Sequence, residues 1–259
     1  MAFERLHPGR PEWDAYYANH IHRYRFAAER LRGGGNVLDA ACGVGYGSRF
    51  LAENGIGRIV AVDRDGEALR IARKSFTHEH VRFVQDDCQK LSEAEQHGPF
   101  DAIVSFETLE HLPDPQAFLR RCRALLSGDG RLIVSTPNAN VTGGQGPREW
   151  EYHEQEYTPS ELLAMLRECG FSQTELFGQC YTAIGRLRSA VRGELHQVRS
   201  NPLARVGSWV QRVLRGRPFP GAPLPEHLDD FVIRAFDSAE ECDRLANEGP
   251  FVLIAEARP

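Results

Sequence analysis

Short apolar runs alternate with longer amphipathic segments through the first half of the chain. The predicted strands lie at residues 36–41, 58–62, 81–85, 100–106 and 131–135. The predicted helices between them lie at residues 46–54, 67–76 and 115–126. This alternation favours a parallel sheet with helices on both faces, whose right-handed crossovers place all the strand carboxyl ends on one edge. Ligands of such sheets bind at that edge.

Both ends of the chain depart from this alternation. The pattern over residues 13–31 suits one or two helices, which Gly33-Gly34-Gly35 ends. Further on, the sequence predicts a helix at 158–169 and strands at 171–180 and 251–257. The pattern between these two strands is broken by Pro202, Pro218, Pro220, Pro223 and Pro225, which favours an inserted lid over further sheet. We therefore expect three parts, namely an N-terminal helical cap (1–32), a main domain (33–180 plus 250–259) and a lid or acceptor region (181–249).

Composition narrows the class of protein. The chain has 259 residues, with 41% hydrophobic and 26% charged residues, as in ordinary globular domains. Its net charge of -5 is mild and does not suggest a protein that coats nucleic acid. The charged start does not resemble a signal peptide, and no apolar run approaches the roughly 20 residues of a membrane span. The six cysteines form no Cys-x-x-Cys pair, so we expect a cytoplasmic protein with reduced thiols.

The strongest local signal follows the first strand, in the sequence from Val37 to Gly47. Asp39 stands in the strand, and a turn of small residues leads into a helix. Glycines at 43 and 45 permit positive φ and let a ligand approach the backbone, while the helix start offers free N–H groups. A tight turn without a ligand is the structural alternative, because the loop alone is only moderately specific.

Polar residues also end the next three strands. Asp63 ends the second strand, where a carboxylate accepts from ribose hydroxyls. Asp86 and Asp87 end the third, where Asp87 is placed to accept from an adenine amino group. Ser105 and Phe106 stand at the mouth of the fourth. A helix cap or a solvated turn explains each acid by itself, but four such strand ends on one edge jointly indicate a nucleotide-like ligand.

With these motifs, residues 20–176 and the last strand resemble the class I S-adenosylmethionine (SAM) dependent methyltransferases. The family pattern Asp-x-Gly-x-Gly-x-Gly aligns with Asp39, Ala41, Gly43, Gly45 and Gly47, and Ala41 departs from it. The resemblance implies a Rossmann-like α/β fold with a seven-stranded sheet in the order 3-2-1-4-5-7-6. It also implies SAM as cofactor, with Arg23 or Tyr24 reaching the cofactor carboxylate. The implied cofactor contacts are Arg23, Asp39, Ala41, Gly43, Gly45, Asp63, Arg64, Asp86, Asp87, Cys88, Ser105 and Phe106.

The acceptor is less clearly indicated. Residues 20–28 resemble the N-terminal helix of bacterial members associated with glycan biosynthesis, which favours methylation of an oxygen on a small molecule or glycan. Three alternatives stay open: an amino sugar or other amine as acceptor, a non-catalytic SAM-binding protein, and an NAD(P)-dependent reductase. The Gly-x-Gly-x-Gly spacing argues against the reductase. Ser135-Thr136-Pro137-Asn138 does not match the tetrad of nucleic-acid methyltransferases, so we expect no nucleic-acid partner.

Two histidines are candidate bases for a hydroxyl acceptor, because imidazole exchanges protons near neutral pH. His111 follows the fourth strand, and His153 lies on the predicted rim of the acceptor pocket. Each is equally well explained as a packing or loop residue. Glu107, Glu110 and His111 also suggest a divalent cation, but adjacent ligands are poorly spaced on a helix, and we expect no metal.

Residues 186–217 hold eight arginines and one acid, with apolar residues at helical spacing. The favoured interpretation is a lid helix with its arginines in water. A phosphate-bearing acceptor is the next alternative, and peripheral contact with an anionic membrane is less favoured.

Overall fold

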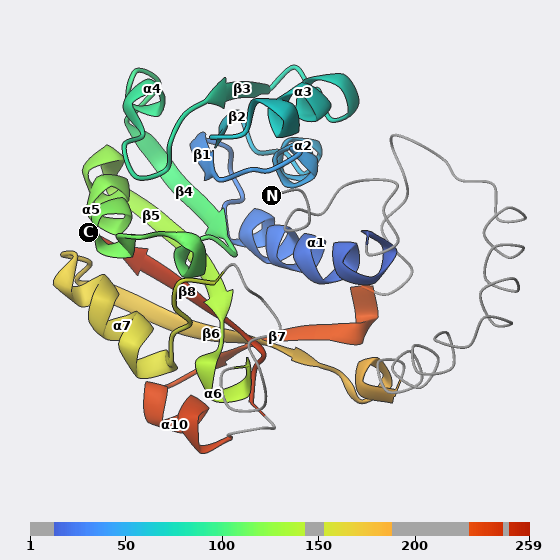
Figure 1. Cartoon of the computed structure of the whole chain (residues 1–259), viewed down its shortest axis with the longest axis vertical. Helices are drawn as coiled ribbons and strands as arrows, with labels where there is room; N and C mark the ends of the chain where they lie inside the picture. The colour runs from blue at the N-terminus through green and yellow to red at the C-terminus, as the bar shows by residue number, and fades with distance from the viewer. Residues whose placement is uncertain (1–12, 143–152, 188–227, 246–248) are drawn as a thin grey trace, which may run out of the picture.

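A computed structural model of the chain describes residues 13–142, 153–187, 228–245 and 249–259, and these form one α/β fold around a single sheet (Figure 1). The strands run in the order β3-β2-β1-β4-β5-β8-β6-β7. The first five in this order pair in parallel, and β8, β6 and β7 pair antiparallel. The strands are β1 (Asn36–Ala40), β2 (Arg58–Asp63), β3 (Val81–Gln85), β4 (Phe100–Phe106), β5 (Leu126–Pro137), β6 (Gln173–Tyr181), β7 (Phe231–Phe236) and β8 (Val252–Arg258).

The predicted order is confirmed, but the predicted number of seven strands is wrong. The eighth strand is β7, which extends the sheet beyond β6 through pairs from Tyr181↔Phe231 to Leu176↔Phe236. It lies within the stretch where proline spacing favoured a lid without sheet. The sequence of β7 is apolar except at Arg234, but this edge strand buries only its two end residues, Phe231 and Phe236.

Helices cover both faces of the sheet, as predicted (Figure 1). The helices α1, α2 and α3 pack on one face, where Ile21 of α1, Leu51 of α2 and Leu69 of α3 share a buried cluster. On the other face, Phe118 of α5 and Leu162 of α7 belong to a second cluster. The helical segments are α1 (Trp13–Arg30), α2 (Tyr46–Glu53), α3 (Gly66–Ser75), α4 (Ser92–Glu95), η1 (Leu109–His111), α5 (Pro115–Leu125), α6 (Ala139–Thr142), α7 (Pro159–Glu168), η2 (Leu228–Asp230) and α10 (Ala239–Arg244).

Local sequence sets the helix starts. Thr158 and Glu161 form a capping box at the start of α7, with Pro159 at the first helical position. Asp114 caps α5 and Asp65 caps α3 in the same manner, since each side chain accepts from backbone N–H groups of the first turn. These caps fix where the chain leaves the carboxyl edge of the sheet, and so they position the loops that form the site.

A buried carboxylate ties α1 to the sheet. Glu256 of β8 is 2% exposed, and its oxygens accept from Arg30 at 3.0 Å and from Arg131 at 2.9 Å. Burying a carboxylate is costly unless it is paired and hydrogen-bonded, and both conditions are met here. The last turn of α1 is thereby fixed to β5 and β8. No helix among the described residues is long and apolar enough to cross a membrane.

Candidate active site

A cavity of about 240 Å³ opens at the carboxyl edge of the parallel strands, where the topology predicts a ligand. Most of its residues fall into two groups, which we call the β2–β3 end and the α1 end. The β2–β3 end comprises Asp63, Arg64, Asp87, Cys88 and Gln89. The α1 end comprises His20, Tyr24, Tyr46, Phe106, Glu107, Thr108 and His111. The glycine loop, with Ala41, Cys42, Gly43 and Val44, lines the cavity as well.

The glycine loop makes a tight turn between β1 and α2. Ala41, Gly43 and Gly45 all have positive φ, at 66°, 56° and 85°. A Cβ at Gly45 would lie 2.6 Å from the ring of Phe83, so the close approach to β3 requires glycine there. Ala41 adopts the left-handed conformation despite its methyl group, which costs roughly 1–2 kcal/mol relative to a right-handed one. The substitution of alanine for the family's glycine is therefore tolerated, but strained.

Asp63 stands at the end of β2 and faces the cavity. Its side chain is 3% exposed and accepts from the backbone N–H groups of Gly43 and Asp65, both at 2.9 Å. The carboxylate lines the cavity, where its oxygens are placed to accept from ligand hydroxyls. The bonds to the glycine loop hold the carboxylate in a fixed orientation, as expected of a group that recognises a ribose.

Arg64, Asp87 and Cys88 complete the β2–β3 end as the sequence predicted, and Gln89 joins them. Two further predicted contacts lie outside the cavity lining. The buried Asp86 side chain accepts from the N–H groups of Glu93 and Ala94 at 2.8 and 2.9 Å, which fixes the start of α4. Ser105 donates to the carbonyl oxygen of Ala40 at 2.9 Å, which links β4 to β1. Both side chains thus hold strand ends in place.

Asp39 is fully buried below the α1 end. Its carboxylate accepts from Ser48 Oγ at 2.6 Å and from Tyr24 Oη at 3.2 Å. Burial raises the pKa of Asp39 to about 7, and the two hydrogen bonds oppose that rise. The ring of Tyr24 crosses α2 so closely that a Cβ at Gly47 would overlap it. Asp39 therefore places the Tyr24 ring in the cavity wall without itself lining the cavity.

Arg23 lies beside the α1 end but outside the lining. Its guanidinium is fully buried, and Nη1 donates to Asn19 Oδ1 and Gln179 Oε1, both at 2.8 Å. Its Nε and Nη2 atoms have no hydrogen-bond partner. Unpaired donors on a buried cation are costly, which is consistent with the predicted use of this arginine on an anionic group of a ligand.

The loop after β4 carries the acidic and basic groups nearest the α1 end. Glu107 has a φ of 53°, and this sparsely populated conformation is held by its backbone N–H bond to Ser135 and by the Ser135 hydroxyl, which donates to Glu107 Oε1 at 2.8 Å. The turn continues into η1, which buries Glu110 and leaves His111 at the cavity.

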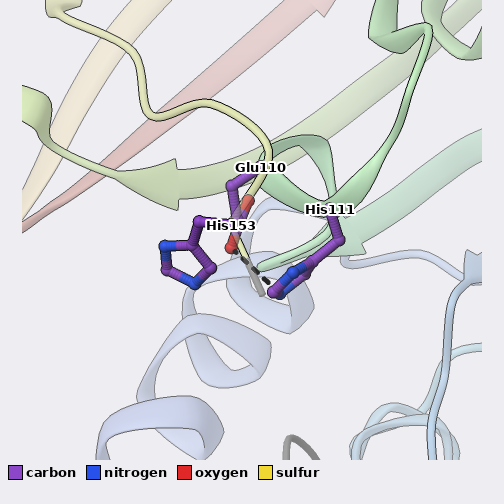
Figure 2. Close-up of side chains that lie close together, drawn as sticks. All are labelled: Glu110, His111 and His153. Atoms are coloured by element: carbon purple, nitrogen blue, oxygen red, sulfur yellow. Dashed lines mark ion pairs between the residues drawn. The ribbon is translucent and has the colours of Figure 1, made fainter. Parts of the chain in front are cut away.

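Figure 2 shows that Glu110 and His111 converge with His153, which comes from a distant part of the chain. The two imidazole rings lie 4.8 Å apart between centroids, and His111 Nε2 lies 3.9 Å from Glu110 Oε1. Burial, and then the charge of Glu107, raise the pKa of Glu110 well above its ordinary value. On its other side His153 Nδ1 contacts Glu156 Oε1 at 2.8 Å. Both candidate bases predicted from sequence are therefore side by side.

The same three residues have the chemistry of a cation site. Their ligand atoms all lie within 4.8 Å of one another, and Glu110 Oε1 is buried without a hydrogen-bond partner. Two imidazoles and a carboxylate suit a first-row divalent ion, and Glu156 would orient His153 from behind. The motif after the fourth strand suggested Glu107 as the third ligand instead of His153, because a local motif does not predict contacts between distant segments.

Several lining residues were not predicted as site residues, among them His20, Tyr46 and Gln89. Tyr46 lies inside the glycine motif, so its position next to Gly45 was a usable signal. His20 Nδ1 lies 3.1 Å from Tyr46 Oη, and burial lowers the pKa of His20 well below its ordinary value. This contact depends on how α1 docks on α2, and no local pattern predicts it.

The fold and this cavity define a Rossmann-like α/β protein with a nucleotide-type ligand site at the carboxyl edge of its sheet. Residues 13–176 match the model of a methyltransferase domain family. This match covers more than half of the chain, and the protein belongs to that family. It is a SAM-dependent methyltransferase, and this assignment decides against the reductase alternative.

Named relatives agree with the family. The chain is 33% identical over 174 residues to the ubiquinone biosynthesis O-methyltransferase of Xanthomonas axonopodis pv. citri, which covers 61% of this chain and 72% of that protein. The fold of the present chain is similar to that of a SAM-dependent methyltransferase from Archaeoglobus fulgidus, with a TM-score of 0.56 and 17% identity. The match covers 93% of this chain and 94% of that one. A SAM-dependent methyltransferase from Mesorhizobium loti gives a TM-score of 0.54 at 18% identity, with coverage of 97% and 99%.

Proposed function

We propose that this methyltransferase transfers the methyl group of SAM to a hydroxyl oxygen of a small-molecule acceptor, with the His111–His153 pair as the proton acceptor. The observation that carries the proposal is the pair of imidazoles, of which His111 lines the α1 end of the cavity, while His153 and the buried Glu110 lie next to it outside the lining (Figure 2). In this assignment the β2–β3 end holds adenosine, with the ribose on Asp63. The α1 end then faces the methionine part of SAM and the acceptor.

The reaction is an in-line displacement at the methyl carbon. The acceptor oxygen forms a bond to this carbon while the carbon–sulfur bond breaks, and its electron pair stays on sulfur. The products are a methyl ether and neutral S-adenosylhomocysteine (SAH), so no anionic leaving group needs stabilisation. The protein has to align the two reactants, exclude water and remove the acceptor proton. An imidazole of the pair takes that proton, and an imidazolium at His111, with Nε2 3.9 Å from Glu110 Oε1, in turn favours the ionised form of the buried Glu110.

The class of acceptor is the second part of the proposal. The relatives at about one-third identity are named ubiquinone biosynthesis O-methyltransferases, which favours a phenolic hydroxyl over a sugar hydroxyl for this chain. A phenol loses its proton near pH 10 and an imidazolium near pH 6.5, so the proton transfer is uphill by itself and becomes favourable as the oxygen bonds to the methyl carbon. A glycan hydroxyl and an amine remain as competing acceptors. A role for residues 181–249 in acceptor binding stays a prediction, since 188–227 lie outside the described residues.

The test measures SAH formation with a panel of catechol-type phenols, sugars and amines. We expect turnover with a phenol. We also expect at least one of the variants His111→Gln and His153→Gln to lower kcat tenfold or more. Both variants should bind SAM within twofold of the wild-type affinity. His97→Gln serves as the matched control, because His97 lies away from the cavity lining. Full activity of both site variants on the best acceptor would overturn the proton-transfer assignment. Turnover of sugars or amines alone would overturn the assignment of a phenolic acceptor.

A chelator arm separates proton transfer by imidazole from activation by a metal ion. If imidazole alone acts, incubation with EDTA followed by dialysis leaves kcat unchanged. If a cation is bound by Glu110, His111 and His153, activity falls with EDTA and returns with a divalent ion, and Glu110→Gln abolishes the return. In that case the three side chains would hold the ion, which would supply Lewis-acid activation of the acceptor, and our assignment of the base would be replaced.

A further inference from the structure

Aromatic rings form one wall of the α1 end. Tyr24 from α1, Tyr46 from the start of α2 and Phe106 from the end of β4 all line the cavity. The Tyr24 and Phe106 rings pack edge to face with centroids 4.9 Å apart and an angle of 86°. Tyr24 and Tyr46 lie 6.0 Å apart at 75°. We call these three residues the aromatic wall.

The wall is held rigidly in place. The hydroxyl of Tyr24 is fixed by Asp39 at 3.2 Å, and its ring occupies the space that a side chain at Gly47 would need. Tyr46 has the Tyr17 ring 5.4 Å away and the His20 imidazole on its hydroxyl. Phe106 is 7% exposed at the strand end. Rings that are fixed before a ligand arrives lose little conformational entropy on binding, which favours specific recognition.

Acids outnumber bases among the side chains that line the cavity, while the buried guanidinium of Arg23 lies beside the α1 end outside the lining. Among the residues that line the cavity, the acids are Asp63, Asp87 and Glu107, and Arg64 is the one guanidinium or ammonium group. Arg64 belongs to the β2–β3 end, whereas Glu107 follows Phe106 directly. Aromatic faces attract cations through the ring quadrupole, and cages of this kind recognise onium groups in general.

We infer that the aromatic wall binds the positively charged sulfonium of SAM and thereby distinguishes the cofactor from its neutral product. The inference rests on the cofactor orientation proposed above, in which the α1 end faces the methionine part. SAM and SAH differ there by one methyl group and one positive charge. When the methyl group leaves, the charge disappears, and the attraction to the rings is lost at the moment when the product has to dissociate. The wall thus acts as a specificity determinant that limits inhibition by the product.

The experiment compares three ligands by calorimetry on the full chain. SAM carries a sulfonium, sinefungin carries an ammonium at the same position, and SAH is neutral. We expect Tyr46→Leu and Phe106→Leu each to weaken SAM and sinefungin on the order of tenfold, and SAH by less than twofold, since leucine keeps apolar bulk but lacks the π face. Tyr46→Phe is the matched control, because it keeps the ring and removes only the hydroxyl on His20. It is expected to retain the preference for the cationic ligands.

SAH binding serves as an internal check on folding, because it uses the same adenosine contacts. Equal weakening of all three ligands in both leucine variants would overturn the inference, as would loss of the charge preference in Tyr46→Phe. The outcome is separable from the proposed acceptor. If the wild-type protein methylates no phenol, but the leucine variants selectively lose the cationic ligands, the proposed function is wrong and the inferred role of the wall stands. If the protein methylates a phenol, but the leucine variants show no charge-dependent change, only the inferred role of the wall is wrong.

Discussion

At the β2–β3 end of the cavity, each polar group follows a parallel strand directly, so strand order alone brings Asp63, Arg64 and Asp87 together. At the α1 end, the lining and its neighbours come from α1, the start of α2, the loop after β4 and the segment around His153. The β2–β3 end is therefore predictable from local sequence, whereas the α1 end depends on docking between distant segments. One cavity therefore combines an end that follows from strand order with an end that depends on tertiary contacts.

The largest effect is expected from a single substitution at the β2–β3 end. Asp63→Ala removes the proposed ribose acceptor and is expected to weaken SAM about a hundredfold, since hydrogen bonds to a charged group contribute roughly 1.5–3 kcal/mol each. Calorimetry with SAM and SAH measures the loss, which should be equal for both ligands. Asp63→Asn, which keeps one acceptor oxygen, should fall between the two proteins.

Because Asp63 also accepts from Gly43 and Asp65, thermal unfolding has to accompany this measurement. An Asp63→Ala protein that unfolds like the wild type and still binds SAM with unchanged affinity would remove Asp63 from the cofactor site. The division of the cavity into two ends would then lose its main support.

The two ends also differ in how far sequence predicted them. Apolar runs that end in candidate ligand-binding residues predicted β1 to β4 and the cavity-lining residues Asp63, Asp87 and Phe106, because a parallel sheet converts chain order into position. The pairing of His111 with His153 was not predictable, since β5 and a segment outside the described residues separate them. The edge strand β7 was missed for a related reason. Its sequence is apolar except at Arg234, but the prolines that precede it favoured an insertion over further sheet, and its pairing with the distant β6 cannot be seen in local sequence.

A second prediction tests whether the α1 end depends on docking. Glu256→Gln removes the buried charge that Arg30 and Arg131 share, and we expect it to lower the free energy of unfolding by about 2 kcal/mol, because the arginines lose two charge-assisted bonds but keep access to water. Glu175→Gln is the control. Its carboxylate also contacts Arg30, at 3.3 Å, but is 61% exposed, so its removal should cost less than about 0.5 kcal/mol.

Denaturant unfolding in the absence of ligand measures both variants. The variant at Glu256 should also bind SAM more weakly than the variant at Glu175, since α1 carries Tyr24 and His20 into the cavity. Equal stability of the two proteins would show that the buried carboxylate does not hold α1, and that the helix docks through its apolar face alone.

The smallest expected effect concerns the loop that joins the two ends. Ala41 has a φ of 66°, which strains any residue with a Cβ, and glycine relieves this strain at some cost in the entropy of the unfolded chain. Ala41→Gly should therefore raise the free energy of unfolding by roughly 0.5–1 kcal/mol and leave SAM affinity equal or higher. Ala40→Gly, one residue earlier in the regular strand β1, should change stability by a similar amount in the opposite direction. If both glycines destabilise the protein equally, Ala41 is not strained, and its methyl group contributes packing that the cavity needs.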